Sequence, residues 1–126
     1  MATAVDVVHE FWRLMATNDF HAVGNVLAPD FVLEWPQTKE RIRGAERFAL
    51  MNHEYPAKGR WQFSINRLIG GETEAVSDVT VSDGVRTDRA ISFFTVARGK
   101  VTRIVEFWPE ASSPGSNRAH LTEPMD

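Results

Sequence analysis

The chain contains no cysteine among its 126 residues, which excludes disulfide bonds, thiolate metal ligands and thiol nucleophiles. It also lacks an excess of basic residues, because 14 Lys and Arg stand against 17 Asp and Glu, for a net charge of −3. A field of this sign does not attract a phosphate backbone, so we expect no nucleic-acid partner. No segment approaches the roughly 20 apolar residues of a membrane span, and the first residues do not resemble a secretory signal. We therefore expect a cytoplasmic protein with no membrane partner.

Metal and cofactor signals are equally scarce. His9, His21 and His53 fall in three separate segments without ligand spacing, so no metal site is expected. The Gly70-Gly71 and Asp83-Gly84 pairs are typical of turns and form no phosphate-binding loop. We expect no cofactor.

What remains is the composition of one globular domain, with 43% hydrophobic and 25% charged residues. We expect residues 1–110 to form this domain. Residues 111–126 are rich in Ser, Pro and Gly at their start and show no clear period, so we expect a C-terminal tail there.

Helical spacing of apolar residues predicts helices over residues 5–17, 20–27 and 45–54. A β-branched and aromatic segment predicts a strand over 31–35, and the polar residues 37–43 are expected to form a loop. After residue 56 the apolar period changes to two, and turn signals separate four predicted strands, over 60–68, 74–82, 86–97 and 101–108. Three helices ahead of hairpin-connected strands favour an α+β fold with an antiparallel sheet.

Several short segments carry a resemblance to a known superfamily. They are Asn18-Asp19-Phe20, Leu27-Ala28-Pro29-Asp30-Phe31, Ile42-Arg43-Gly44 and the ending Glu106-Phe107-Trp108-Pro109. With the order of elements, they resemble the cone-shaped fold shared by nuclear transport factor two, ketosteroid isomerase and the SnoaL-like polyketide cyclases. The resemblance covers about residues 5–110. It implies three N-terminal helices packed on a curved, mostly antiparallel sheet that encloses a pocket.

Strand alternation decides which side chains can face that pocket. On the last strand Ile104, Glu106 and Trp108 share one face, and the resemblance to ketosteroid isomerase implies that this is the pocket face. A carboxylate on such an apolar wall loses solvation, which suits a general base or acid near neutral pH. SnoaL-like cyclases carry an acidic general base at the place that corresponds to Glu106. The alternative is a structural carboxylate that pairs with an arginine or the backbone.

The same alignment places Asp78 and Thr80 from one strand, and Ser92 and Phe94 from the next, in the pocket. Asp78 and Glu106 would then repel each other, so that the pair could supply both an acid and a base, with Ser92 assisting. Asp78 has the alternative of an exposed or arginine-paired position. A shift of one residue in strand register would turn carboxylates outward.

The resemblance also implies the remaining pocket lining, from the helices and the first strand. The expected ligand-binding residues are Phe11, Met15, Trp35, Met51, Asn52, Tyr55, Thr80, Phe94, Ile104 and Trp108. Many aromatic side chains with few polar groups suit a flat or cyclic apolar ligand. We expect a small-molecule enzyme that performs cofactor-free acid–base chemistry of the isomerase, cyclase or lyase type. The alternatives are a non-catalytic ligand-binding or dimerisation module and an epoxide hydrolase.

The residues that two activities of the superfamily require are not present at the corresponding positions of this sequence. The functional positions of ketosteroid isomerase correspond to Phe11, Trp35 and Ser92, all of which differ from that enzyme, so steroid isomerisation is not expected. Limonene-type epoxide hydrolases use an Arg and an Asp two residues apart, which correspond to Val76 and Asp78. Because the arginine is missing, the epoxide hydrolase alternative is weakened.

The opposite face of the late strands is also predicted to be apolar. Its residues are Val79, Val81, Ile91, Phe93, Val105 and Phe107. An uncovered apolar sheet face usually marks a protein contact, and sheet-to-sheet homodimers are common in the superfamily that the chain resembles. We expect a homodimer through this face.

Overall fold

The computed structural model describes residues 2–125 and begins with the predicted amphipathic helix, α1 (Ala4–Ala16). A capping box starts this helix, since the Thr3 side chain accepts from the Asp6 N–H and the Asp6 side chain accepts from the Thr3 N–H. Its apolar face is buried and includes Val8, Phe11 and Trp12. The helix thereby sets one wall of the molecule's interior.

The helix predicted over residues 20–27 is shorter than expected. The chain forms only a 3-10 helix there, η1 (Ala22–Val26), before β1 begins at Leu27. Five residues that include Gly24 and β-branched Val23 and Val26 offer too few hydrogen bonds for a stable α-helix. The third predicted helix forms as α2 (Ala45–Glu54), so residues 2–125 hold two α-helices rather than three.

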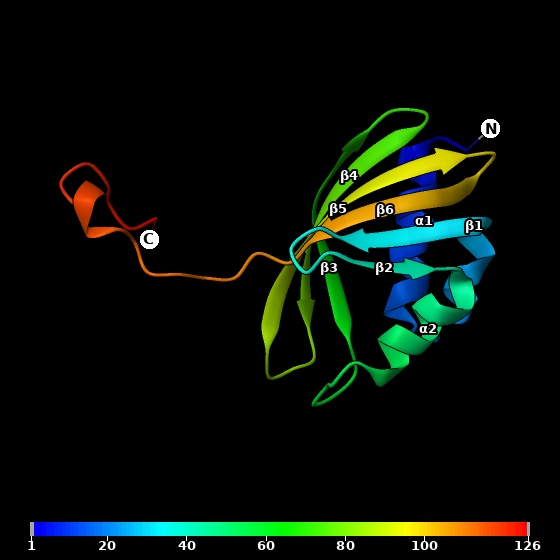
Figure 1. Ribbon diagram of the computed structural model, residues 1–126, viewed down its shortest axis with the longest axis horizontal. Helices are drawn as coiled ribbons and strands as arrows, with labels where there is room; N and C mark the ends of the chain where they lie inside the picture. The colour runs from blue at the N-terminus through cyan, green and yellow to red at the C-terminus, as the bar shows by residue number, and fades with distance from the viewer. Residues whose placement is uncertain (1, 126) are drawn as a thin grey trace.

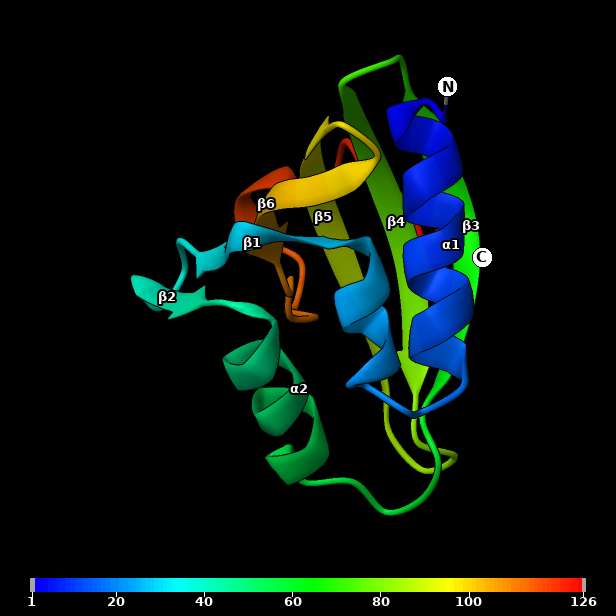
Figure 2. The ribbon, with the colours of Figure 1, turned by 90° about the vertical axis from the view of Figure 1, so that its right-hand side faces the viewer.

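Six strands form one curved sheet, which confirms the α+β class and its mostly antiparallel character. The strands are β1 (Leu27–Trp35), β2 (Glu40–Arg43), β3 (Gln62–Gly70), β4 (Glu74–Ser82), β5 (Thr87–Ala97) and β6 (Lys100–Phe107). Their order is β2-β1-β6-β5-β4-β3, and β1 and β6 form the parallel pair. Figure 2 shows α1 and α2 in front of one face of this sheet, which we call the inner face.

The short strand β2 replaces part of the loop predicted over residues 37–43. It pairs with β1 in antiparallel register, with Glu34 opposite Arg41 and Trp35 opposite Glu40. Arg41 also donates to the Glu34 carboxylate. A four-residue edge strand with three charged residues gives little sequence signal, because its stability comes from the partner strand.

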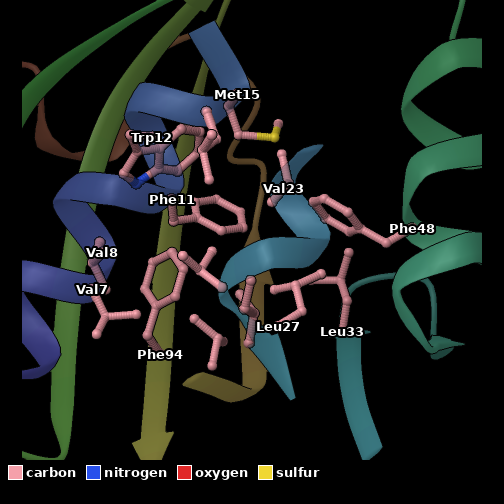
Figure 3. Close-up of a cluster of buried hydrophobic side chains, with 14 of the residues drawn as sticks. Val7, Val8, Phe11, Trp12, Met15, Val23, Leu27, Leu33, Phe48 and Phe94 are labelled. Atoms are coloured by element: carbon pink, nitrogen blue, oxygen red, sulfur yellow. The ribbon is translucent and has the colours of Figure 1, made fainter. Parts of the chain in front are cut away.

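The core lies between α1 and the inner face of the sheet. The ring of Phe11 packs edge-on against Phe94, with centroids 5.1 Å apart, and lies 5.9 Å from the ring of Phe48 on α2 (Figure 3). The Trp12 indole donates a 3.1 Å hydrogen bond to the buried Ser77 hydroxyl. This bond satisfies the polar atom that β4 carries into the core.

The register of β4 corrects the predicted division between its two faces. Ala75, Ser77, Val79 and Val81 are buried on the inner face, and the intervening residues are only half-buried on the outer face. Val79 and Val81 therefore belong to the core and not to the expected dimer surface. Ala75 and Ser77 are small and leave room for the bulky rings of α1, which explains why β4 presents this face to the helix.

Residues 108–125 carry no strand, and the one helical turn described among them is η2 (Ser116–Arg118). In Figure 1 this segment extends away from the sheet, on the side opposite α1 and α2. None of the helices described in residues 2–125 is long and apolar enough to cross a membrane.

A turn after β4 ties the segment that follows α2 to the sheet. The Asp83 carboxylate accepts backbone N–H bonds from Arg86 (2.8 Å), Lys58 (2.8 Å) and Val85 (3.0 Å). These three bonds lower the pKa of Asp83 from 3.8 to about 2, because they favour the ionised form. The carboxylate thus clamps two loops together.

We predict that Asp83→Asn lowers the thermal midpoint at neutral pH and weakens its dependence on acid. A pKa that is lower in the folded state stabilises the fold above the unfolded pKa, and this stabilisation is lost as the pH falls from about 4 to about 2. Thermal unfolding followed across this pH range checks the prediction. Asp30→Asn, at an exposed position on β1, is the matched control. An unchanged acid dependence in Asp83→Asn would contradict the assigned clamp.

Candidate functional site

A cavity of about 350 Å³ opens between the inner face of the sheet and the two helices. Its lining contains most of the residues predicted to bind a ligand, together with Glu106. They are Phe11, Met15, Trp35, Met51, Asn52, Tyr55, Glu106 and Trp108. The lining is predominantly aromatic and aliphatic, as in small-molecule pockets.

The Glu106 carboxylate lies on the cavity wall with only 7% of the residue exposed. Its Oε1 atom accepts hydrogen bonds from the Trp35 indole at 3.1 Å and the Trp108 indole at 2.9 Å. Its Oε2 atom accepts from the Ser92 hydroxyl at 2.7 Å. Donors from the two strands that flank β6, Trp35 on β1 and Ser92 on β5, and from Trp108 just after β6 therefore hold one carboxylate.

All three donors to Glu106 are neutral. Within residues 2–125, no lysine, arginine or histidine forms an ion pair with this carboxylate. A salt bridge to an arginine, one of the two forms of the structural alternative for Glu106, is absent from this described part of the chain. The hydrogen bonds fix the carboxylate in place without cancelling its negative charge.

Asp78 lies on the outer face of the sheet, so the predicted pairing of Asp78 with Glu106 in one pocket is wrong. Arg89 forms two hydrogen bonds with it, at 2.7 Å and 2.5 Å, and Asn66 adds another. These contacts, with Arg89 first, hold the pKa of Asp78 below its ordinary value. Thr80 shares this face and accepts from Asn66 at 2.8 Å, so it does not line the cavity either.

Three further predicted residues face inward without lining the cavity. Phe94 and Ile104 are 1% and 0% exposed and belong to the core. Ser92 is completely buried and reaches the site only through its bond to Glu106. Ser92 is therefore placed to position the carboxylate rather than to touch a ligand.

The cavity also includes residues that the sequence reasoning missed. They are Trp12, Gln37, Thr38, Glu40, Phe48, Trp61, Phe63, Val81, Arg86, Asp88, Pro109 and Glu110. The aromatic members carried a signal, because Trp12 lies on the apolar face of α1 and Phe63 alternates with exposed residues of β3. The charged members come from turns and an edge strand, where no periodic pattern points to a cavity.

No group of three or more potential metal ligands gathers anywhere in residues 2–125. The histidines lie apart from the carboxylate. His21 and His53 stack on each other with ring centroids 5.2 Å apart, beside Phe20 rather than in the cavity. The chemistry that the site offers comes from Glu106, the most buried carboxylate of the lining, and the hydrogen-bond donors around it.

A curved sheet closed by helices around an apolar cavity defines a class of cone-shaped, pocket-forming α+β proteins. Within that class the sequence comparison is specific, because the model of the SnoaL-like domain matches residues 8–104. The chain belongs to the SnoaL-like family. A comparison with functionally curated proteins found no match.

Solved structures support this assignment. A provisional ketosteroid isomerase from Kribbella flavida DSM 17836 is 32% identical, with a TM-score of 0.86, over 95% of this chain and 87% of that one. An LEH-like epoxide hydrolase from M. tuberculosis is 22% identical, with a TM-score of 0.67, over 84% and 82% of the two chains. A SnoaL-like polyketide cyclase from Shewanella putrefaciens CN-32 is 9% identical, with a TM-score of 0.67, over 82% and 77%. The last two show the fold alone.

We predict that Ser92→Ala lowers the free energy of unfolding by about 1–3 kcal/mol, because a buried carboxylate oxygen loses its donor. Urea denaturation measures this change. Ser64→Ala, which removes the same hydroxyl at an exposed position on β3, is the control. Equal stability of the two variants would show that the Ser92 bond does not hold Glu106.

Proposed function

We propose that the protein is a SnoaL-like enzyme that moves a proton on a small cyclic substrate, with Glu106 as the group that takes and returns it. One observation carries the proposal: a buried carboxylate lies on the wall of an apolar cavity, held by three neutral donors. Such a group is fixed in position and keeps its capacity to accept a proton.

The proposed step breaks a C–H bond next to a carbonyl or comparable acceptor. Glu106 takes the proton, and the electron pair of the C–H bond moves toward the carbonyl oxygen. The same carboxyl then returns the proton to the same or a neighbouring carbon, so that no oxidant, reductant or cofactor is consumed. Thr38, Asn52 and Tyr55 supply polar groups on the lining that could bind the developing negative oxygen.

The competing interpretation is a binding module with no chemistry. The three donors on Glu106 are also consistent with it, because a hydrogen-bonded buried carboxylate can be purely structural. Epoxide opening has less support, since Asp78 is bound to Arg89 on the outer face.

We also propose that two copies associate through the outer face of the sheet. Ile91, Phe93, Val105 and Phe107 form an apolar patch there, with Phe93 opposite Val105 and 46% exposed. The rings of Phe93 and Phe107 pack edge-on at 6.2 Å. The C-terminal segment extends on this same side, away from the helices (Figure 1), where a second copy could contact it.

We predict that the protein accelerates deuterium uptake at the carbon next to the carbonyl of a ring ketone, and that Glu106→Gln abolishes this activity. NMR in D₂O measures the exchange on 1-tetralone and on a tetralone that carries a protonated dimethylaminomethyl group. The glutamine oxygen can still accept from both indoles, and its amide can donate to the Ser92 hydroxyl. The thermal midpoint of the variant should therefore change little.

Glu72→Gln removes the same charge at an exposed position outside the cavity and should exchange at the wild-type rate. If Glu106→Gln exchanges as fast as the wild type, Glu106 is not the base. If neither ketone exchanges faster than in buffer while both bind, the binding-module interpretation replaces the enzyme.

The proposed contact between two copies is tested separately, by the molar mass in solution. Light scattering at micromolar concentration should give twice the 14.2 kDa of the chain, and Phe93→Glu should give a monomer, because it places a charge in the patch. Leu50→Glu introduces the same charge at a 42% exposed position on α2 and should remain dimeric. A monomeric wild-type protein would contradict the proposed contact.

A further inference from the structure

The cavity concentrates the aromatic residues of the chain. All four tryptophans and the only tyrosine line it, along with three phenylalanines from α1, α2 and β3. Apolar volume alone could be filled by leucine or valine, which dominate much of the core elsewhere. Indole and phenol rings differ from these in the negative potential at their faces.

The charges on the lining are unbalanced. It carries four carboxylates, from Glu40, Asp88, Glu106 and Glu110, against the single guanidinium of Arg86. Arg86 is itself paired with Asp88 at 2.8 Å. The deepest of these charges is Glu106, which is 7% exposed and has no cationic partner in residues 2–125. A buried charge of this kind is most stable with a counter-charge nearby.

The hydrogen bonds to Glu106 connect these two features. The Trp35 and Trp108 indoles both donate to one carboxylate oxygen, and both also line the cavity. Donation to an anion pushes electron density from the N–H into the ring, so that hydrogen-bonded groups polarise one another. Their ring faces therefore attract a positive charge more strongly than isolated indoles do.

We propose that the ligand of this cavity is an organic cation: a quaternary ammonium or protonated amine attached to an apolar ring frame. The positive centre would contact the faces of the tryptophans within the field of the Glu106 carboxylate, without a hydrogen bond to its oxygens, and the frame would fill the apolar lining. This inference rests on the proposed function, of which it names the substrate class. It also predicts poor binding of carboxylates and phosphates, which the lining charges repel.

The test uses two probes of nearly the same shape. The first probe, 3-(trimethylammonio)phenol, has a positively charged nitrogen where the second, 3-tert-butylphenol, has a neutral carbon. A mildly acidic buffer keeps both phenols protonated. Isothermal titration calorimetry with the full chain gives the two affinities. We expect the cation to bind at least about tenfold more tightly than the neutral probe.

Two variants separate the sources of this preference. Glu106→Gln removes the charge, and Trp61→Leu removes a ring face from the rim while keeping an apolar side chain. Each should reduce the preference for the cation several-fold while the affinity for 3-tert-butylphenol changes little. Glu72→Gln, with the same change of charge outside the cavity, should retain the preference of the wild type.

Equal affinities of the two probes for the wild-type protein would overturn the cation proposal, as would a preference that Glu106→Gln leaves intact. Neither result affects the deuterium-exchange test, which includes a neutral ketone. Conversely, a clear cation preference without any exchange would leave the ligand class standing and remove the proposed proton transfer.

Discussion

The hydrogen bonds from Trp35, Trp108 and Ser92 to Glu106 are the interaction on which the site depends. They connect β1, β6 and β5, which are consecutive in the sheet, and they involve a carboxylate that is almost completely buried. Burying a carboxylate without hydrogen bonds would cost several kcal/mol, so the three donors are a condition for its position. Because Trp35 and Ser92 lie on strands and Trp108 follows β6 directly, the donors also fix the direction in which the carboxylate faces the cavity.

The fold separates packing from binding along the inner face of the sheet. Where α1 crosses the sheet, Phe11, Phe94 and Ile104 fill the interior, and small residues of β4 accept the rings. Where α2 approaches the end of β1, the side chains are half-buried tryptophans and a tyrosine, and the interior stays open. The clamp at Asp83 holds the rim by joining the segment after α2 to the turn that carries Arg86.

The sequence predicted the orientation of Glu106 but not that of Asp78. On β6 the alternation of Val105 and Phe107 with Ile104 and Glu106 left the two faces equally apolar, and the family resemblance decided between them. On β4 one face is mostly polar, with Glu74, Asp78 and Thr80, and the other is mostly apolar. The alternation favoured burial of the apolar face, but the resemblance was followed instead and gave the wrong one. The hydrogen bond from the Trp12 indole to Ser77 joins residues 65 positions apart, so a local pattern predicts the buried face of β4 but not the partner of its buried hydroxyl. Rim residues such as Arg86 and Glu40 were missed because their turns and edge strand have no periodic signal.

Neutral donors around Glu106 have a consequence that an arginine would not have. A guanidinium would satisfy the same oxygens and also cancel the charge, leaving an inert ion pair. Indole and hydroxyl groups satisfy the oxygens while the charge stays on the cavity wall, where the burial of Glu106 weakens screening. The site therefore retains a negative potential that a positively charged or proton-donating ligand can relieve. The polarised indoles extend this potential from one carboxylate across the ring faces, so that recognition of the ligand and acceptance of a proton would draw on the same group.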